Sequence, residues 1–555
     1  MRPRVPASLW RPSRLGALVG LAALLSSFGP ALIPRHWLVQ AVVGGVTGAL
    51  GYLIGASLAR LLPWLGRVLG VRVLLAERTT VWAKRIIVLG VIVAVPVAEW
   101  VTLRWHRWTA EMVGMPPNTA WQHAMSMALA AGLAALFVLT AHGLGWVVRL
   151  LGRWLDRVLP RSVAYVLAFV LVVGLLVWGT NSVLWRGTLE AFARSGAALN
   201  DTTPEGLVAP TSPFRSGSPT ATQSWDQLGH FGRQFVSRGP SAADITAATG
   251  VPAVDPVRVY AGLDDTDGLD DALDIVATEM ERTGALDRDV VVLITTTGNG
   301  WIDEYNVAAI EYLTGGDSAT IGMQYSYLPS AVAFVADWNT PQRVGRELLT
   351  RVESMIAQRP AGERPKLYVS GESLGAFGGQ AAFSSPQDML TRVDGAVWIG
   401  GPSFTPLWQQ VTASRHRASP EVAPVIDSSR QIRFMSQPDD LRRDVYGRVY
   451  GGWEFPRVVY LQHPSDPIVW WNPSVVFSEP KWIAEQAGHD VNPRLRWVPV
   501  VTFWQLVGDM VVSTDTLSGH GHVYEDEMVP AWNQVLNTHS DRIAQITAAI
   551  RNSLP

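Results

Sequence analysis

Five apolar stretches, each about long enough to cross a lipid bilayer as a helix, fill the first third of the chain. They cover residues 15–33, 37–62, 85–103, 121–148 and 162–184. A helix satisfies its own backbone polar groups inside lipid, and about twenty apolar residues suffice for one helical crossing. The sequence therefore predicts an α-helical membrane domain over residues 1–190, with about five transmembrane helices.

The first two stretches carry additional signals. The first follows a basic start, but no convincing small-residue cleavage site precedes Pro34, so a signal anchor is favoured over a cleaved signal peptide. The second is rich in glycine, which suits close packing of helices in lipid. Its glycines are Gly44, Gly45, Gly48, Gly51 and Gly55.

Basic residues concentrate in alternate connecting segments, which predicts an orientation. The rich segments are the N-terminus (Arg2, Arg4, Arg11, Arg14), the loop after the second stretch (Arg67, Arg72, Arg78, Lys84, Arg85) and the loop after the fourth (Arg149, Arg153, Arg157, Arg161). An excess of Lys and Arg marks the cytoplasmic side. An odd number of spans then places the chain after residue 184 outside the cytoplasm. We predict a multi-pass protein of the cell membrane with an extracytoplasmic C-terminal domain.

Polar residues are scarce inside the apolar stretches. Glu99 and Asn181 lie near the predicted outer ends, where water and headgroups reach them, and His123 and His142 flank the fourth stretch. A proton or ion pathway needs several ionisable groups near mid-membrane. An anchor, or a scaffold that gives access to membrane lipids, is therefore favoured over a transporter.

The remainder of the chain reads as a linker followed by an α/β domain. Residues 191–224 are rich in Pro, Ser, Thr and Gly and predict the linker. In residues 225–555, β-type runs alternate with helical patterns, which is typical of a mostly parallel sheet with helices on both faces. The predicted strands are 257–260, 290–295, 320–325, 366–370, 395–399, 458–461 and 497–502, and the predicted helices include 269–282, 306–313 and 342–357.

Composition excludes several classes of function. The chain has no cysteine, which excludes disulfides, thiol catalysis and cysteine-based metal sites. Its net charge of -2 gives no reason to expect a nucleic-acid partner. The acidic run 264–268 has the wrong register for an EF-hand calcium loop and fits a turn before a helix. We predict no metal and no cofactor, and the oligomeric state stays open.

Residues 366–379 contain the most informative local motif. A short β-type run leads into Gly371-Glu-Ser-Leu-Gly375, and small, helix-compatible residues follow. This order of strand, sharp turn and helix is that of a nucleophile elbow, in which the residues two before and two after the serine must be small. The motif predicts that Ser373 projects from the strand tip as a nucleophile.

An activated serine needs a base and an acid that orients the base, in the chain order Ser, acid, His. Asp466 follows a late predicted strand and is the favoured acid, and Asp439 and Asp440 are the alternatives. The base is expected in Ser518-Gly-His-Gly-His522, just before a terminal helix. His522 is favoured, with His520 as the alternative. The pair of histidines lacks the further ligands that a metal site would need.

The oxyanion formed at such a serine needs two backbone N–H donors. Leu374, directly after the serine, is expected to supply one. The second should follow an earlier strand, where residues 295–301 form a Gly-rich turn. Thr297 is the first candidate and Gly298 the second, and an ordinary turn is the alternative interpretation.

Several segments together resemble a known family. Residues 296–303, 324–329, 364–375, 460–467 and 519–522 look, in this order, like a bacterial family of membrane-bound α/β-hydrolases, which join a multi-span N-terminal region to a C-terminal catalytic domain. The resemblance covers nearly the whole chain. It implies the α/β-hydrolase fold and a serine nucleophile at Ser373. Some related membrane hydrolases remove amino acids esterified to phospholipids, which suggests aminoacyl-lipid esters by analogy.

The predicted function is therefore a membrane-anchored serine hydrolase that cleaves lipid or aminoacyl-lipid esters of the cell envelope. The segment 402–430 is a candidate cap over the site. Four tryptophans are candidates for an apolar pocket or a membrane-facing rim, with burial in the core as the alternative for each: Trp408, Trp453, Trp470 and Trp471. Two other functions stay open, a non-catalytic envelope protein that keeps the fold for binding and a transporter regulated by its C-terminal domain.

Overall fold

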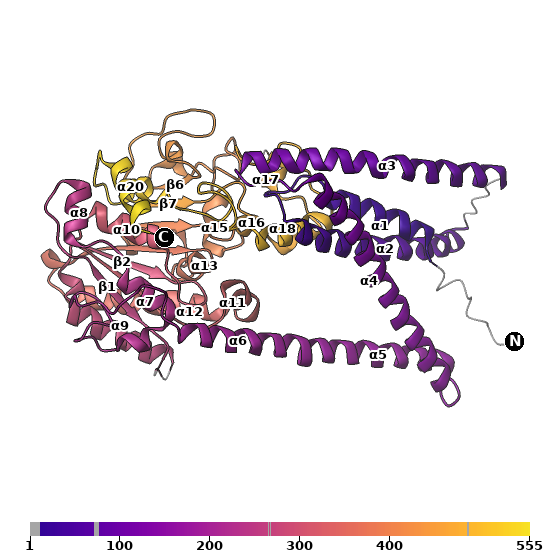
Figure 1. The fold of residues 1–555 in the computed structure, drawn as a ribbon, viewed down its shortest axis with the longest axis horizontal. Coiled ribbons are helices and arrows are strands. Elements are labelled where there is room, and N and C mark those ends of the chain that lie inside the picture. Colours follow the sequence, from indigo (N-terminus) through magenta and orange to yellow (C-terminus); the bar gives the residue numbers. More distant parts are fainter. Residues whose placement is uncertain (1–11, 71–76, 265, 267, 486–487, 555) are drawn as a thin grey trace. The chain divides into compact units, whose positions relative to one another are not determined.

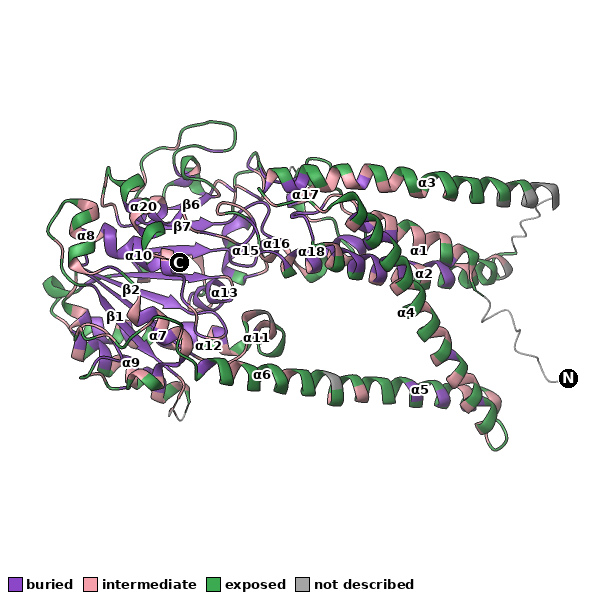
Figure 2. Cartoon of the chain, viewed as in Figure 1, coloured by how far each residue is buried: buried purple, intermediate pink, exposed green. Residues whose placement is uncertain are grey.

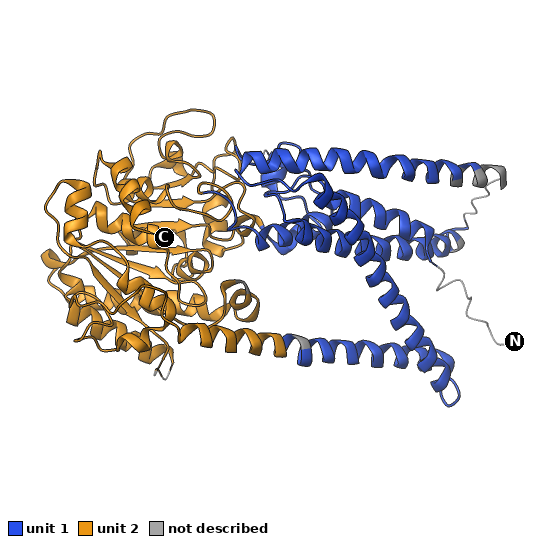
Figure 3. Ribbon diagram, in the orientation of Figure 1, with its two compact units in different colours: residues 1–185, 471–517 blue, residues 186–470, 518–555 orange. Residues whose placement is uncertain are grey.

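The structure, a computed structural model, describes residues 12–70, 77–264, 266, 268–485 and 488–554. The chain forms two compact units (Figures 1 and 3). Unit 1 contains residues 1–185 and 471–517, and unit 2 contains residues 186–470 and 518–555. Four residues of the predicted basic segments, Arg2, Arg4, Arg11 and Arg72, lie outside the described residues, as do Asp265 and Asp267 of the acidic run.

Unit 2 is built on a seven-stranded sheet with the spatial order β1-β3-β2-β4-β5-β7-β6. All six neighbouring strand pairs run parallel. The strands are β1 (Val257–Ala261), β2 (Val290–Thr295), β3 (Ser318–Met323), β4 (Lys366–Glu372), β5 (Gly395–Ile399), β6 (Ile432–Met435) and β7 (Arg457–Leu461). The predicted α/β fold with a parallel sheet is confirmed.

Helices cover both faces of this sheet, and for that reason the strands are buried along almost their whole length (Figure 2). One face carries α9 (Leu269–Thr283), α12 (Asn339–Ala357) and α13 (Leu374–Gln380). The other carries α8 (Ala242–Thr249), α10 (Glu304–Leu313), α19 (Met528–Val535) and α20 (Ile543–Ser553). The remaining helices of unit 2 are α6 (Arg186–Asn200), α7 (Gly229–Ser237), α11 (Ser330–Ala336), α14 (Pro386–Arg392), α15 (Pro406–Ala413) and α16 (Pro467–Trp470).

The N-terminal part of unit 1 is a group of long apolar helices. They are α1 (Arg14–Ser27), α2 (Trp37–Val68), α3 (Glu77–Met112), α4 (Ala120–Leu155) and α5 (Arg161–Gly179), which a π-helical turn (Thr180–Trp185) joins to α6. Glycines of α2 bring its neighbours close, as predicted. A Cβ atom on Gly51 would lie 2.7 Å from Ala23 of α1, and one on Gly45 would lie 2.6 Å from Leu133 of α4. No larger side chain fits at these positions without moving a helix.

The first predicted span requires a correction. Among the described residues, four helical segments are long and apolar enough to cross a membrane, namely Trp37–Gly66, Arg85–Met112, Ala120–Leu155 and Arg161–Asn200. Helix α1 has only 14 residues, about 21 Å of helix against a hydrocarbon core of about 30 Å. It ends early because Pro30 disfavours helical backbone at the residue before it. The prediction of about five spans is thus reduced to four full-length ones.

Residues 471–517, which we expected within the C-terminal domain, pack with the N-terminal helices in unit 1. Their main helix is α18 (Val501–Val511), and α17 (Lys481–Glu485) precedes it. A Cβ atom on Gly508 would lie 2.6 Å from Val43 of α2, and Gln505 donates a hydrogen bond to the Ser27 carbonyl (3.2 Å). The predicted strand over residues 497–502 is wrong. Its β-branched residues favour a strand, but packing against α1 and α2 determines a helix from Val501 onward.

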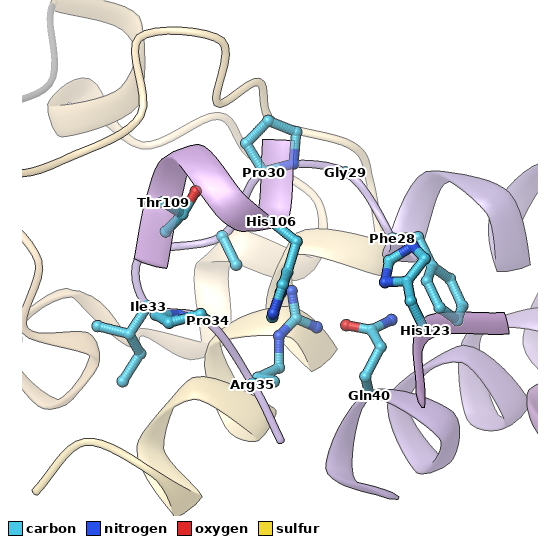
Figure 4. A pocket seen from close by; sticks show the side chains of 11 residues that line it. Phe28, Gly29, Pro30, Ile33, Pro34, Arg35, Gln40, His106, Thr109 and His123 are labelled. Atoms are coloured by element: carbon cyan, nitrogen blue, oxygen red, sulfur yellow. The ribbon is translucent and has the colours of Figure 1, made fainter. Parts of the chain in front are cut away.

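A buried ion pair joins this segment to the turn between α1 and α2. Arg35 Nε lies 2.9 Å from Asp509 Oδ1, and both side chains are almost fully buried. Burial lowers the pKa of Arg35 and raises the pKa of Asp509 to about 6, while the attraction between the two charges opposes both shifts. Figure 4 shows Arg35 beside His106 and Gln40 in a small pocket of unit 1 that polar and apolar side chains line together. The pair explains how residues distant in sequence are held in one unit.

The predicted linker is partly structured. Its first residues belong to α6, and its later residues have no helix or strand, but two of them are held firmly. The buried Ser216 donates a hydrogen bond to Glu279 (2.7 Å), and the buried Gln223 accepts one from the Gly262 amide (2.9 Å). Low hydrophobicity therefore identified a segment without regular structure, but buried polar contacts fix it to the sheet domain.

The close approach of α12 to α13 yields a stability prediction. A Cβ atom on Gly345 would lie 2.3 Å from the Gly378 carbonyl oxygen, which is backbone and cannot rotate away. Alanine improves helix propensity by about 1 kcal/mol, but overpacking costs about 1–3 kcal/mol. We expect Gly345→Ala to lower the midpoint of thermal unfolding by several degrees. Gly362→Ala is the control, because a Cβ atom on Gly362 would have no other atom within 4 Å. Equal midpoints for both variants would contradict the packing argument.

Candidate active site

The predicted reactive residues gather at the C-terminal ends of four adjacent strands. Thr295 of β2 pairs with Gly371 of β4, Glu372 of β4 with Ile399 of β5, and Ile399 with Leu461 of β7. This register aligns the strand ends, so the loops that follow them meet at one edge. The chain also reverses its direction of progress across the sheet between β2 and β4, which is where α/β sheets bind ligands.

Ser373 occupies the sharp turn between β4 and α13. Its backbone has φ 53° and ψ −118°, a conformation that L-residues adopt at a cost of about 1–3 kcal/mol. The flanking glycines are required by space. A Cβ atom on Gly375 would lie 2.1 Å from the Thr295 carbonyl oxygen, and one on Gly371 would lie 2.6 Å from the Gly375 carbonyl carbon. The geometry is that of a nucleophile elbow.

Asp466 and His522 meet beside this turn. Asp466 Oδ2 lies 2.7 Å from His522 Nδ1, and the Asp466 side chain is fully buried. The second carboxylate oxygen accepts a hydrogen bond from the Ile468 amide (2.8 Å). The His522 ring lies against the backbone of Gly400, where a Cβ atom would be 2.6 Å from the ring carbon Cε1. With Nδ1 bound to Asp466, Nε2 is the ring nitrogen left to act on a substrate or a hydroxyl.

Within the described residues, no hydrogen bond joins the Ser373 hydroxyl to His522. The two residues are nevertheless close in the fold. The Ser373 amide donates to the Ile399 carbonyl (2.9 Å), one residue before Gly400, and His522 Nε2 lies 3.9 Å from Glu372 Oε1. The structure therefore brings Asp466 and His522 into contact. It also places His522 next to Glu372 and Gly400, which both lie close to Ser373.

Tyr524 and His463 belong to the same network, and sequence reasoning missed both. The Tyr524 hydroxyl donates a hydrogen bond to Asp466 Oδ2 (2.7 Å) and accepts one from the His463 amide (3.1 Å). The His463 and Tyr524 rings stack with centroids 4.1 Å apart. His463 Nδ1 also bonds to the Gly521 carbonyl (2.9 Å), which fixes the loop that carries His522. The only sequence signal for this network was the position of Tyr524, two residues after the predicted base His522.

His520, the alternative base, lies in a different setting. Its carbonyl accepts a hydrogen bond from the Val523 amide (3.2 Å), so the residue closes the turn that presents His522. The alternative acids also lie elsewhere. Asp440 Oδ2 accepts hydrogen bonds from the Ser436 amide and hydroxyl (2.9 and 2.8 Å), and Asp439 pairs with Arg443 at 2.9 Å. Both follow β6, at the edge of the sheet.

A pair of buried carboxyl groups adjoins the site, and sequence reasoning missed it as well. Glu372, directly before Ser373, lies within electrostatic reach of Asp303, which caps the start of α10. Burial raises the pKa of Glu372 well above its usual value, and the nearby charges of Asp303 and Asp466 raise it further. Burial likewise raises the pKa of Asp303 to about 7. Both carboxyl groups therefore favour their protonated forms more strongly than an exposed carboxyl group does.

The candidate oxyanion donors differ in availability. The Thr297 amide donates to the Trp301 carbonyl (3.1 Å), so it closes its own turn and is unsuitable as a donor in this conformation. The Gly298 amide has only a long contact of 3.4 Å to the Ser330 hydroxyl. Leu374 is the first residue of α13, where the N–H groups of a helix point away without intrahelical partners. Leu374 and Gly298 are thus the better-placed pair.

The tryptophans proposed for a pocket rim are mostly structural. Trp408 and Trp470 are buried with their rings 6.3 Å apart, and Trp408 donates to Gln462 (2.9 Å). Trp453 packs against the main core of unit 2 and lies 4.2 Å from the Arg433 guanidinium. Trp471 belongs to unit 1, where its ring lies 5.6 Å from Phe503. The proposed cap segment 402–430 contains α15 and a short 3-10 helix (Asp427–Ser429) and has no strand.

The buried carboxyl pair predicts a pH-dependent stability. Groups with a raised pKa keep protons in the folded state that the unfolded chain has released, so the pair costs stability increasingly as the pH rises from about 4 towards 7. Glu372→Gln removes one carboxyl and leaves a hydrogen-bond donor for Asp303. We expect a gain on the order of 2 kcal/mol in unfolding free energy at about pH 8 and little change near pH 4. Denaturant titration at both pH values measures it, with the exposed Glu363→Gln as the control. A gain that is the same at both pH values would refute the prediction.

Comparisons with known proteins agree with this geometry. A model of the alpha/beta-hydrolase family matches residues 257–548, and a model of the N-terminus of that family matches residues 28–240. No curated protein and no solved structure matches the chain. The first match covers more than half of the chain and includes the whole parallel sheet together with Ser373, Asp466 and His522. The chain belongs to the alpha/beta-hydrolase family.

Proposed function

We propose that this protein is a membrane-anchored serine hydrolase that cleaves carboxylic esters through an acyl-enzyme. Ser373 is the nucleophile, His522 the general base and Asp466 the group that orients His522. The observation that carries the proposal is the 2.7 Å contact of Asp466 with His522 Nδ1 beside a strained serine at a strand-to-helix turn. Nucleophile, base and orienting acid follow each other in the chain order expected for this fold.

The reaction proceeds in two halves. His522 Nε2 takes the proton of Ser373 while Oγ attacks the ester carbonyl carbon, and the amides of Leu374 and Gly298 stabilise the resulting oxyanion. The carbon–oxygen bond to the alcohol then breaks, and the imidazolium gives its proton to the leaving oxygen. In the second half a water molecule, deprotonated by His522, attacks the acyl group on Ser373. The acid is released and the serine regains its proton.

The neighbouring groups support His522 in this role. Asp466 carries a negative charge next to Nδ1, so it stabilises the imidazolium that forms when Nε2 takes a proton. Tyr524 and the Ile468 amide hold the carboxylate in place. Burial and the charge of Asp303 raise the pKa of Glu372, which disfavours a second negative charge close to Nε2. A fully ionised Glu372 would compete with the serine hydroxyl for that nitrogen.

The proposed substrate class follows from the apolar helices that precede the catalytic unit in the chain. Four helices long and apolar enough to cross a membrane precede it in the chain, so lipid or aminoacyl-lipid esters of the cell envelope are the substrates it would meet most readily. Membrane lipids are accordingly its proposed partners. The basic loops favour an extracytoplasmic catalytic unit.

The first test is covalent labelling of membranes with a fluorophosphonate, which reacts with activated serines. We expect wild type to label, Ser373→Ala to give no label, and His522→Ala to label at least about a hundredfold more slowly because general-base assistance is lost. His520→Ala is the matched control and should label like wild type. In-gel fluorescence measures all four proteins after their folding has been checked by thermal unfolding.

The other outcomes are equally informative. Slow labelling of His520→Ala with normal labelling of His522→Ala would transfer the base to His520. A folded wild-type protein that takes no label would refute the serine mechanism and favour the non-catalytic binding function.

The proposed orientation can be tested by cysteine accessibility, because the chain has no cysteine of its own. Glu363 of unit 2 and Asp156, in the loop between α4 and α5, are both exposed. In intact cells, Glu363→Cys should react with a membrane-impermeant maleimide, whereas Asp156→Cys should react only after permeabilisation. One candidate span, Arg161–Asn200, separates the two positions, so this expectation does not depend on whether the short α1 crosses the membrane. The reverse pattern would place the catalytic unit in the cytoplasm.

A further inference from the structure

Four aromatic side chains form a cluster at the edge of the sheet that carries Ser373. The aromatic cluster consists of Phe334, Trp338, Phe377 and Phe404. All six pairs of their rings lie between 4.4 and 6.1 Å from centroid to centroid. The rings come from three separate places in the chain, namely α11 with the residues after it, α13, and the loop after β5. Loops from several strands therefore converge on one apolar surface.

This cluster adjoins both proposed oxyanion donors. Leu374 is buried together with Phe377 and Ala333 in one apolar group, and the Phe377 amide donates to the Ser373 carbonyl (3.0 Å). On the other side, a Cβ atom on Gly298 would lie 2.8 Å from Ala333 of α11. The surface is thus attached to the nucleophile through α13 and to the second donor through α11.

Part of this surface is open. Trp338 is 40% exposed and Val335, on the same short helix as Phe334, is 58% exposed. Helix α11 has the sequence Ser-Ala-Val-Ala-Phe-Val-Ala and is apolar on all sides, which is typical of a buried helix and not of one at a surface. An apolar surface that is left accessible next to a reactive serine indicates a binding site for an apolar group.

The reaction geometry identifies which part of an ester this surface would receive. His522 must give its proton to the leaving oxygen, so the alcohol part of the ester lies on the side of His522 and Asp466. The oxyanion points towards Leu374 and Gly298. The acyl group takes the remaining direction, away from His522, where the aromatic cluster borders Leu374.

We infer that the aromatic cluster binds the acyl group of the substrate, and that this group is an apolar hydrocarbon chain and not an aminoacyl group. The inference rests on the proposed serine mechanism. Trp338 and Phe404 determine the preference for chain length, because their rings border the open part of the surface. One fully buried methylene is worth about fourfold in binding. A chain of several methylenes on a half-open aromatic surface should gain at least about tenfold.

The test compares two fluorophosphonates that differ only in the alkyl group on phosphorus, methyl in one and octyl in the other. The readout is the ratio of the two labelling rates at Ser373 within each protein, which cancels differences in the amount of folded protein. In wild type we expect the octyl reagent to react at least about tenfold faster. Trp338→Ala and, as a second variant, Phe404→Leu should bring the ratio to within about threefold of unity. Tyr446→Ala, which removes an exposed ring outside the cluster, should keep the wild-type ratio.

Each outcome supports or overturns the inference. A wild-type ratio near unity, or a high ratio that Trp338→Ala and Phe404→Leu leave unchanged, would overturn it while labelling of Ser373 still upheld the serine mechanism. Failure of both reagents to label wild type would overturn the mechanism and the inference together. A high ratio that falls in both cluster variants but not in Tyr446→Ala would establish the acyl site.

Discussion

The crowding around the turn between β4 and α13 is the constraint on which the candidate site of unit 2 depends. The Thr295 carbonyl of β2 approaches Gly375 so closely that a Cβ atom there would lie 2.1 Å away. This contact presses the start of α13 against the end of the neighbouring strand and forces Ser373 into a positive φ. The sheet supplies the rigidity that holds this strain, because β4 is hydrogen-bonded to a parallel strand on each side.

Asp466 and Glu372, the two acidic groups near His522, have different hydrogen-bond partners and charged neighbours. Asp466 receives three hydrogen-bond donors, from His522, Tyr524 and Ile468, which suit a carboxylate. Glu372 faces another carboxyl group, and burial raises its pKa. The two buried acids within reach of one imidazole therefore have different surroundings: hydrogen-bond donors surround the one on Nδ1, and burial disfavours the charged form of the one near Nε2. This difference is what a general base needs.

Unit 1 combines segments that are distant in the sequence. The charge of Arg35 would be very costly to bury alone, and Asp509 neutralises it from a segment more than four hundred residues later. The same segment interrupts unit 2 in the chain between Asp466 and His522. The proposed acid and base therefore lie on opposite sides of residues 471–517 in the sequence. Ser465 accepts a hydrogen bond from the Gly521 amide (2.9 Å), which links the chain before this segment to the chain after it.

The sequence by itself determined the features that depend on local pattern. Apolar length identified four helices long enough to span a membrane. Period and alternation identified β1, β2, β3, β4, β5 and β7 of the parallel sheet, and the small residues around Ser373 identified the elbow. Only the tertiary structure decided the features that depend on packing between distant residues. These include the helical state of residues 501–511, the membership of residues 471–517 in unit 1, and the engagement of the Thr297 amide with Trp301. Glu372 stood in the motif from the start, yet its raised pKa became visible only with Asp303 beside it, because burial and a neighbouring charge are properties of the folded chain.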